Sequence, residues 1–168
     1  MGVASSGKSV TGKAVARRLH APFLDGDAFH PAANKDKMRA GIPLTDDDRW
    51  PWLSALATEL GKAAQTKGVA VGACSALRRA YRDYMVKEAG EPILFVFLEG
   101  TAELIGSRIA TRTHEYMPAT LLASQFATLE MPAADENVLP VPVTLSVEAI
   151  AERVVKAVPY LKSFRRKQ

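Results

Sequence analysis

The sequence predicts an α/β fold in which helices cover both faces of a parallel sheet. Short apolar runs that suit buried strands recur along the chain, and a helical pattern follows each of them. Strands that are apolar throughout are typical of parallel sheets with both faces buried. The 168 residues are 48% hydrophobic and 24% charged, which suits a single globular domain spanning residues 1–168.

In the first part of the chain, helix and strand patterns alternate. The pattern at 8–20 has one apolar side, formed by Val10, Ala14, Val15 and Leu19. A short strand is expected at 22–24 and a short helix at 31–39. Three aspartates at 46–48 predict the start of a longer helix, because carboxylates favour a helix N-terminus. The run at 69–73 is apolar throughout and predicts a buried strand.

The second part of the chain continues this alternation. The run at 93–98 is the clearest buried strand, and a last strand is expected at 138–143. Pro140 and Pro142 place that last strand at a sheet edge, because proline cannot donate to a strand ladder. Helices are expected at 76–88, 101–111, 119–129 and 147–161.

Composition and charge argue against several classes of protein. The formal charge is +4, from 22 Lys and Arg against 18 Asp and Glu, and the excess lies in a basic tail at 162–168. A tail of this kind predicts a solvated end rather than a nucleic-acid surface. The single cysteine, Cys74, excludes an intramolecular disulfide. No apolar run approaches the ~18 residues that span a bilayer, and no signal peptide is expected, so we expect a cytoplasmic protein without a membrane partner.

The start of the chain matches a phosphate-binding loop, G-x-x-x-x-G-K-[ST]. The residues concerned are Gly2, Val3, Ala4, Ser5, Ser6, Gly7, Lys8 and Ser9, with Val10 directly after them. Small residues let successive backbone N–H groups surround phosphate oxygens, while the lysine reaches the β- and γ-phosphates and the final serine holds Mg²⁺. The alternative is a Gly/Ser-rich tail before a helix.

A phosphate loop ordinarily follows a buried strand, whereas only Met1 precedes this one in the sequence. We therefore expect the first strand to be either truncated or upstream of Met1. That strand would be a central one, so its loss would remove many apolar contacts.

In addition to the loop, blocks of residues in order along the chain resemble the bacterial gluconokinase family, a branch of the P-loop small-molecule kinases. The blocks are 23–27, His30-Pro31, Asn34, 37–38, 41–44, 46–49, 51–53, 74–77, 81–83, Arg112, His114, 121–122, 124–126, 129–130 and 135–136. The resemblance implies ATP-dependent phosphorylation of D-gluconate to 6-phospho-D-gluconate. It also implies a three-layer P-loop kinase fold with a lid at 112–120, and a homodimer. The chain departs from the family at Ala4 and Ser5 of the loop and at Glu115-Tyr116.

Phosphoryl transfer depends on positioning and charge neutralisation. The expected catalytic residues are Lys8, Asp27 and Arg112. Asp27 is the candidate base for the attacking hydroxyl, and Asp25 is a candidate Mg²⁺ ligand together with Ser9. The two aspartates could exchange these roles, or both could close a turn or cap the next helix.

Binding of gluconate needs a cation for the carboxylate and polar groups for the hydroxyls. The candidates, besides Asp27, are His30, Arg49, Arg78 and Arg82. Three of them have a structural alternative: a packed ring for His30, a helix-start salt bridge for Arg49 and a solvated face for Arg82. Related kinases imply that Arg108 stacks on adenine and that Arg112 reaches the transferring phosphate; ordinary surface arginines are the alternative. No role is assigned to His114.

Two other functions remain open from the sequence. One is a nucleotide-binding homologue that has lost activity with its first strand. The other is a related kinase for another small hydroxy acid, such as shikimate, or for a nucleotide. The block at 30–53 argues against a different substrate, because this region shapes the acceptor pocket.

Overall fold

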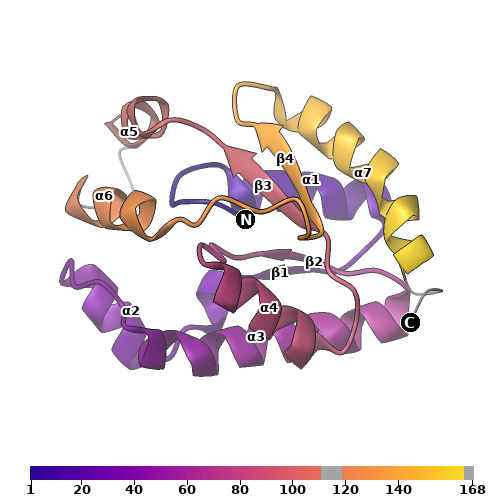
Figure 1. Ribbon diagram of the computed structural model, residues 1–168, viewed down its shortest axis with the longest axis horizontal. Helices are drawn as coiled ribbons and strands as arrows, with labels where there is room; N and C mark the ends of the chain where they lie inside the picture. The colour runs from indigo at the N-terminus through magenta and orange to yellow at the C-terminus, as the bar shows by residue number, and fades with distance from the viewer. Residues whose placement is uncertain (111–118, 165–168) are drawn as a thin grey trace.

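Two pairs of parallel strands form the centre of the molecule (Figure 1). The computed structural model describes residues 1–110 and 119–164. β1 (Phe23–Asp25) pairs with β2 (Val71–Ala73), and β3 (Phe95–Glu99) pairs with β4 (Val138–Pro142). β2 and β3 face each other across the middle of the molecule, and the N-terminus lies between them. Within the described residues β4 pairs with β3 alone, which agrees with the edge position predicted from its prolines.

Helices cover both sides of these strands and complete the predicted three-layer α/β fold (Figure 1). Their bounds are α1 (Lys8–Leu19), η1 (Gly26–Phe29), α2 (Ala32–Arg39), α3 (Asp46–Lys67), α4 (Arg79–Ala89), α5 (Ala102–Ala110), α6 (Ala119–Thr128) and α7 (Val147–Phe164). α1 packs on α7 at one side, and α3 packs on α4 at the other. None of the described helices is long and apolar enough to cross a bilayer.

Two apolar cores correspond to the two helix layers. One is built around α1 and α7 and includes Val15, Leu98 and Val141. The other lies under α3 and α4 and includes Leu53 and Phe95. Because Leu98 and Phe95 both come from β3, this strand contributes to each core, as a central strand of a three-layer fold must.

The start of α3 differs in detail from the prediction. The capping residue is Thr45, one position before the three aspartates. Its hydroxyl accepts the Asp48 N–H at 3.3 Å, and the Asp48 carboxylate accepts the Thr45 N–H at 2.9 Å. This reciprocal capping box satisfies two backbone donors at the helix start. The aspartates therefore lie in the first turn, where their charge suits the helix dipole.

The backbone of Met1 occupies a place in the sheet. Its amino group donates to the Val96 carbonyl oxygen, and its carbonyl oxygen accepts the Leu98 N–H at 3.0 Å. On the other side, Gly2 N–H donates to the Ser75 carbonyl oxygen at 3.1 Å. Among residues 1–110 no strand precedes the phosphate loop, so Met1 and Gly2 together connect β3 to the segment that follows β2.

Burial changes the protonation of two groups near this connection. Burial, assisted by the neighbouring Lys8, lowers the pKa of the Met1 amino group to about 5. Burial also raises the pKa of the Cys74 thiol to about 11. Both groups are therefore neutral at pH 7 in the folded chain, whereas an exposed amino terminus would be largely protonated.

The buried amino group predicts a pH dependence of stability. Between about pH 5 and about pH 8 the unfolded chain binds a proton that the folded chain excludes, so stability rises with pH in this window. Urea unfolding of the 168-residue chain should show the free energy of unfolding increasing by roughly 1–2 kcal/mol from about pH 6.5 to about pH 8.

The matched control is the same chain with an acetylated N-terminus, which has no amino group to titrate and should lose most of this increase. Cys74 stays protonated in this window, and the pKa of His30 is lowered to about 4, so that its titration contributes mainly below pH 6.5. An identical slope in the acetylated chain would contradict the assignment.

Candidate active site

The loop between Met1 and α1 has the geometry expected of a phosphate-binding loop. The backbone φ angle is 137° at Gly2, 58° at Ser5 and 95° at Gly7, so the chain turns sharply. A Cβ atom on Gly2 would lie 3.1 Å from the Leu98 carbonyl oxygen, which leaves room only for glycine. α1 begins at Lys8 and directs its N-terminal N–H groups and positive dipole end toward the loop.

Ser5 is the strained residue of this loop. Its φ of 58° lies in the left-handed region, where a residue other than glycine is uncommon. Ser5 is also one of the two loop positions at which the chain departs from the family pattern.

Two side chains of the loop suggest an anion. The Lys8 ammonium donates to the Val3 carbonyl oxygen at 2.7 Å, which holds it against the loop. The Ser6 hydroxyl is buried, and in the described part of the chain it has no hydrogen-bond partner. Buried hydroxyls are almost always paired, and a phosphate oxygen would supply the acceptor that is needed here. Val10, which directly follows the loop, is 53% exposed.

α6 reaches the phosphate loop through Gln125. The Ala4 N–H donates to the Gln125 side-chain oxygen at 2.6 Å. The Gln125 oxygen therefore occupies a backbone N–H of the loop, and such N–H groups are the donors that phosphate oxygens accept from. Sequence reasoning did not assign Gln125 a role, because the two residues lie 121 positions apart and nothing in their spacing connects them.

Asp25 and Asp27 lie where β1 ends. The Asp25 carboxylate accepts the Asp27 N–H at 3.3 Å and so caps η1, which is the turn-capping alternative considered from the sequence. Asp25 lies opposite Ala73 in the sheet, at the carboxyl end of the strand pair. The Asp27 side chain is exposed at the same edge. Ligands of parallel α/β sheets bind at this edge, so both carboxylates are positioned for chemistry.

The residues present fit a magnesium ion held largely by phosphate and water. In residues 1–110 and 119–164 no group of three or more His, Cys, Asp or Glu side chains gathers as a metal site. Mg²⁺ is usually held through one or two protein oxygens together with substrate phosphates and water. Ser9 and Asp25 can supply those oxygens, and Mg²⁺ would neutralise charge on the phosphates when bound.

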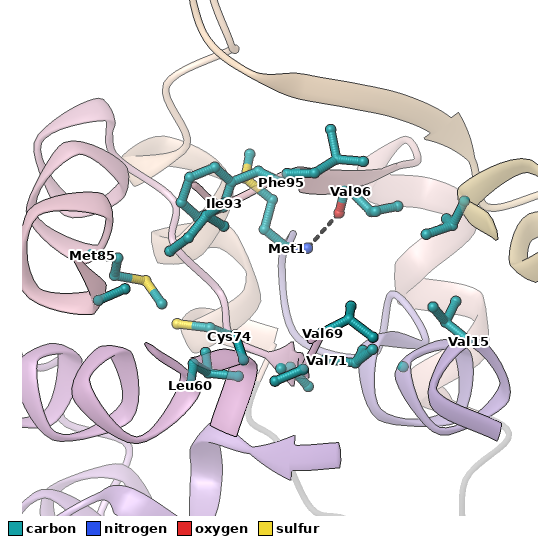
Figure 2. A pocket seen from close by; sticks show the side chains of 18 of the residues that line it. Met1, Val15, Leu60, Val69, Val71, Cys74, Met85, Ile93, Phe95 and Val96 are labelled. Atoms are coloured by element: carbon teal, nitrogen blue, oxygen red, sulfur yellow. Dashed lines mark hydrogen bonds between the residues drawn. The ribbon is translucent and has the colours of Figure 1, made fainter. Parts of the chain in front are cut away.

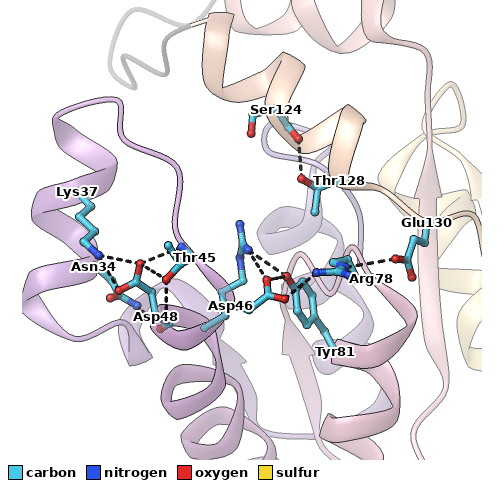
Figure 3. Close-up of polar contacts among 11 residues, drawn as sticks. Asn34, Lys37, Thr45, Asp46, Asp48, Arg78, Tyr81, Ser124, Thr128 and Glu130 are labelled. Atoms are coloured by element: carbon cyan, nitrogen blue, oxygen red, sulfur yellow. Dashed lines mark hydrogen bonds and ion pairs between the residues drawn. The ribbon is translucent and has the colours of Figure 1, made fainter.

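Arg49 and Arg78 form a basic cluster with Asp46 and Tyr81 (Figure 3). Asp46 accepts from Arg78 at 2.7 Å and from Arg49 at 3.1 Å, and Arg49 also donates to the Tyr81 hydroxyl at 2.9 Å. The helix-start salt bridge considered for Arg49 is therefore present. The Tyr81 hydrogen bond, followed by the two arginines, lowers the pKa of Asp46 and keeps it ionised.

This arrangement leaves both arginines able to meet a ligand. The Arg49 side chain is 20% exposed and that of Arg78 is 40% exposed. Arg49 uses a single guanidinium nitrogen, Nη1, for its bonds to Asp46 and Tyr81. Its Nε and Nη2 groups keep the fork geometry that binds a carboxylate through two hydrogen bonds.

A second polar network joins α2 to the start of α3 (Figure 3). The Lys37 ammonium donates to both Asp48 carboxylate oxygens at 2.8 Å, and the Asn34 amide donates to the Asp48 carbonyl oxygen at 2.7 Å. Lys37 and the Thr45 cap lower the pKa of Asp48 to about 2. α2 is thereby held against the helix that carries Arg49.

His30 is a buried neutral ring at the same end of the molecule. It stacks on Trp52 with ring centroids 4.0 Å apart, which is the packed-ring alternative considered from the sequence. Burial, followed by Lys35 and Arg49, lowers the pKa of His30 to about 4. The Asn34 amide nitrogen lies 3.4 Å from His30 Nδ1, so Nδ1 accepts and Nε2 carries the proton. A neutral Nε2–H is a suitable donor for a substrate hydroxyl.

The structure does not support the substrate-binding role predicted for Arg82. Its side chain is 1% exposed and forms an ion pair with Glu136, which is 6% exposed. Its Nη1 also donates to the carbonyl oxygens of Ala76, Leu77 and Glu130. All of these partners are protein groups, and a side chain that is 1% exposed contradicts the solvated-face alternative. Arg82 instead fixes the segment at 130–136 against α4.

Of the remaining predicted residues, only Arg108 belongs to the part of the chain that the structure describes. Arg108 donates to the Val143 carbonyl oxygen at 2.6 Å, just after β4. Arg112, His114 and most of the predicted lid at 112–120 lie outside the described residues, as does the end of the basic tail.

Comparison with known proteins identifies close relatives. A family model described as shikimate kinase matches residues 4–137. The chain is 40% identical to the thermoresistant gluconokinase of Escherichia coli K12, over 94% of this chain and 90% of that protein. The crystal structure of a gluconokinase from Sinorhizobium meliloti 1021 superposes with a TM-score of 0.87 at 39% identity, covering 100% of this chain and 95% of that one.

Similarity to shikimate kinase itself is more distant. The structure of the enzyme from Aquifex aeolicus VF5 superposes with a TM-score of 0.57 at 15% identity, over 95% of this chain and 94% of that one. At this level the likeness concerns the fold alone. The shikimate kinase family model therefore reflects a shared kinase architecture.

The buried Arg82 predicts a loss of stability rather than of substrate affinity. Arg82→Met removes one partner of a buried ion pair and should lower the free energy of unfolding by about 3–5 kcal/mol, measured in urea. Arg79→Met is the matched control, because the Arg79 pair with Asp135 is exposed, and it should change stability by less than about 1 kcal/mol. A normal stability with an increased substrate KM would restore the substrate-binding role of Arg82.

Proposed function

Because the chain belongs to the gluconokinase family, we propose that it transfers the γ-phosphoryl group of ATP to D-gluconate, giving 6-phospho-D-gluconate. The observation that carries this proposal is identity of about 40% to gluconokinases over nearly the whole chain. The family resemblance inferred from sequence is thereby confirmed. Neither an inactive homologue nor a shikimate kinase is favoured.

The phosphate loop and α1 form the nucleotide side of this proposed site. Backbone N–H groups of residues 2–9 and the α1 N-terminus surround the phosphates, and the Ser6 hydroxyl gains the partner that it needs. Lys8 exchanges the Val3 carbonyl oxygen for a phosphate oxygen. The Gln125 side chain must release the Ala4 N–H when a phosphate takes that donor. Ser9 and Asp25 would hold Mg²⁺, which would neutralise charge on the phosphates when bound.

The start of α3 and α4 forms the acceptor side. Arg49 and Arg78, held by Asp46, suit the carboxylate of gluconate, and the neutral His30 donates to one of its hydroxyls. Asp27 takes the proton of the attacking 6-hydroxyl while that oxygen bonds to the γ-phosphorus and ADP departs. Arg108 stacks on adenine, and Arg112 neutralises the transferring phosphate.

α6 and the segment after it connect the two sides of the site. Gln125 contacts the phosphate loop, while the Glu130 carboxylate accepts from Arg78 at 3.3 Å and from the Arg79 N–H at 2.7 Å. Nucleotide binding that displaces Gln125 therefore acts on the segment that holds Arg78. The proposal also includes a homodimer, which the family resemblance implies, and a cytoplasmic location, which was expected from the sequence.

The role of Asp27 as base has a direct test. Asp27→Asn keeps the size of the side chain but cannot accept the proton, so kcat with gluconate should fall by about 10²-fold or more. ATP affinity measured by calorimetry should change little, since the phosphate loop is intact. Asp36→Asn is the control, because Asp36 is an exposed residue of α2 that forms an ion pair with Arg39. Near-normal turnover of Asp27→Asn would move the base elsewhere.

The role of Arg49 is separable from catalysis. Arg49→Ala should raise the KM for gluconate about 10- to 100-fold, the loss of a charge-assisted hydrogen bond, with a smaller effect on kcat and on the KM for ATP. Arg39→Ala removes an exposed arginine from the nearby α2 and should leave all three constants unchanged. If the gluconate KM of Arg49→Ala were also unchanged, Arg49 would act only in its salt bridge with Asp46.

A further inference from the structure

Gln125, on α6, contacts the phosphate loop at the same peptide unit that holds Lys8. Both polar groups of the Val3–Ala4 peptide are engaged by side chains. The carbonyl oxygen of Val3 accepts from the Lys8 ammonium at 2.7 Å, and the Ala4 N–H donates to Gln125 Oε1 at 2.6 Å. Lys8 and Gln125 therefore lie at opposite ends of one peptide unit. Because the lysine of a phosphate loop reaches the β- and γ-phosphates, Gln125 lies beside the place that the terminal phosphates occupy.

The backbone on each side of this contact is held in place. On the loop side, the Met1 amino group donates to the Val96 carbonyl oxygen of β3 (Figure 2). On the α6 side, the Glu130 N–H donates to the Leu77 carbonyl oxygen at 2.9 Å, directly before α4. A nucleotide that enters the loop therefore changes the orientation of the Gln125 side chain more readily than it moves either segment.

The Gln125 amide carries an acceptor and two donors at the same end of the side chain. The Ala4 N–H is a donor, so Oε1 is the group that meets it, and both N–H groups of Nε2 stay outside this bond. A phosphate oxygen that accepts the Ala4 N–H would meet Oε1 as acceptor against acceptor. The last torsion of a glutamine side chain is broad, so a rotation about it replaces Oε1 by Nε2 while the backbone stays in place.

We propose that Gln125 binds the γ-phosphoryl group of ATP, donating from Nε2 to a γ-oxygen after Oε1 has released the Ala4 N–H. The γ-phosphoryl group is then held between Gln125 and Lys8. The segment after α6 also reaches the acceptor side, where the Glu130 carboxylate accepts from Arg78, so this donor lies between the two substrates. A donor fixed at the group that is transferred stabilises the charge that develops during transfer. The inference rests on the proposed transfer from ATP and adds a residue to it.

Two substitutions separate this role from a structural one. Gln125→Met is similar in length and has neither the acceptor nor the donors, whereas Gln125→Glu keeps an oxygen for the Ala4 N–H and loses the donors. In calorimetry with Mg²⁺ present, both variants should bind the non-hydrolysable ATP analogue AMPPNP about tenfold or more weakly, because a hydrogen bond to a charged group is lost. The affinity of Gln125→Met for ADP should change little, since ADP has no γ-phosphate. Its kcat with gluconate should fall about tenfold or more.

Two further measurements complete the test. Gln65→Met is the matched control, because Gln65 is exposed near the end of α3, and this variant should behave as the parent chain in every assay. The side-chain amide resonances of Gln125, identified in nuclear magnetic resonance spectra by their absence from Gln125→Met, should shift on addition of AMPPNP and much less on addition of ADP. This readout does not depend on turnover.

Several results would overturn the proposal. Equal weakening of AMPPNP and ADP binding in Gln125→Met, with a lowered Tm, would leave Gln125 as a structural contact of α6. Tighter binding of both nucleotides would show that it only competes for the Ala4 N–H. If Gln125→Met does not fold, Gln125→Glu decides: a larger loss for AMPPNP than for ADP supports the proposal, and equal affinities for AMPPNP in this variant and the parent overturn it.

Failure of this inference is distinguishable from failure of the proposed function. A parent chain that phosphorylates gluconate, together with a Gln125→Met variant of unchanged kcat and AMPPNP affinity, overturns the role of Gln125 alone. A parent chain without affinity for AMPPNP overturns both.

Discussion

The backbone hydrogen bonds of the first two residues connect the two halves of the molecule. Met1 bonds to β3, and Gly2 bonds to Ser75, which follows β2. The phosphate loop therefore begins at the junction between the two pairs of strands. The loop geometry, the direction of α1 and the position of Lys8 all depend on this anchorage. A loop that must surround phosphate oxygens with backbone N–H groups needs such fixed ends, because a shift of one donor removes part of the cradle.

Charge in the site is organised by few side chains with several partners each. Asp46 holds two arginines and a tyrosine, and Arg82 holds one carboxylate and three carbonyl groups. In the exposed cluster around Asp46, an arginine can replace a contact to the protein with a contact to a ligand at little cost in free energy. The buried pair of Arg82 cannot, since a buried charge without its partner is strongly destabilising. This difference in burial separates the two arginines proposed to bind the substrate from the one that stabilises the fold.

Much of this structure was predictable from sequence, because the signals are local. The strands and helices follow apolar runs and helical periodicity, and the phosphate loop follows a motif with its own steric logic. The errors concern partners that are distant in sequence. Arg82 has the residue type and spacing of an anion-binding residue, but its partner Glu136 is 54 positions away. Gln125 likewise reaches Ala4 only through the fold. The aspartates at 46–48 suggested the cap, while Thr45 provides it, since a capping box depends on a reciprocal bond that composition does not reveal.

The network of Asn34, Lys37, Thr45 and Asp48 has a consequence for how the family can change its acceptor. These contacts join α2 to the first turn of α3, and the same turn is tied to the start of α4, because Asp46 bonds to Arg78 and Tyr81. An altered segment between α2 and α3 must therefore keep the partners of Asp46 if the start of α4 is to stay in place.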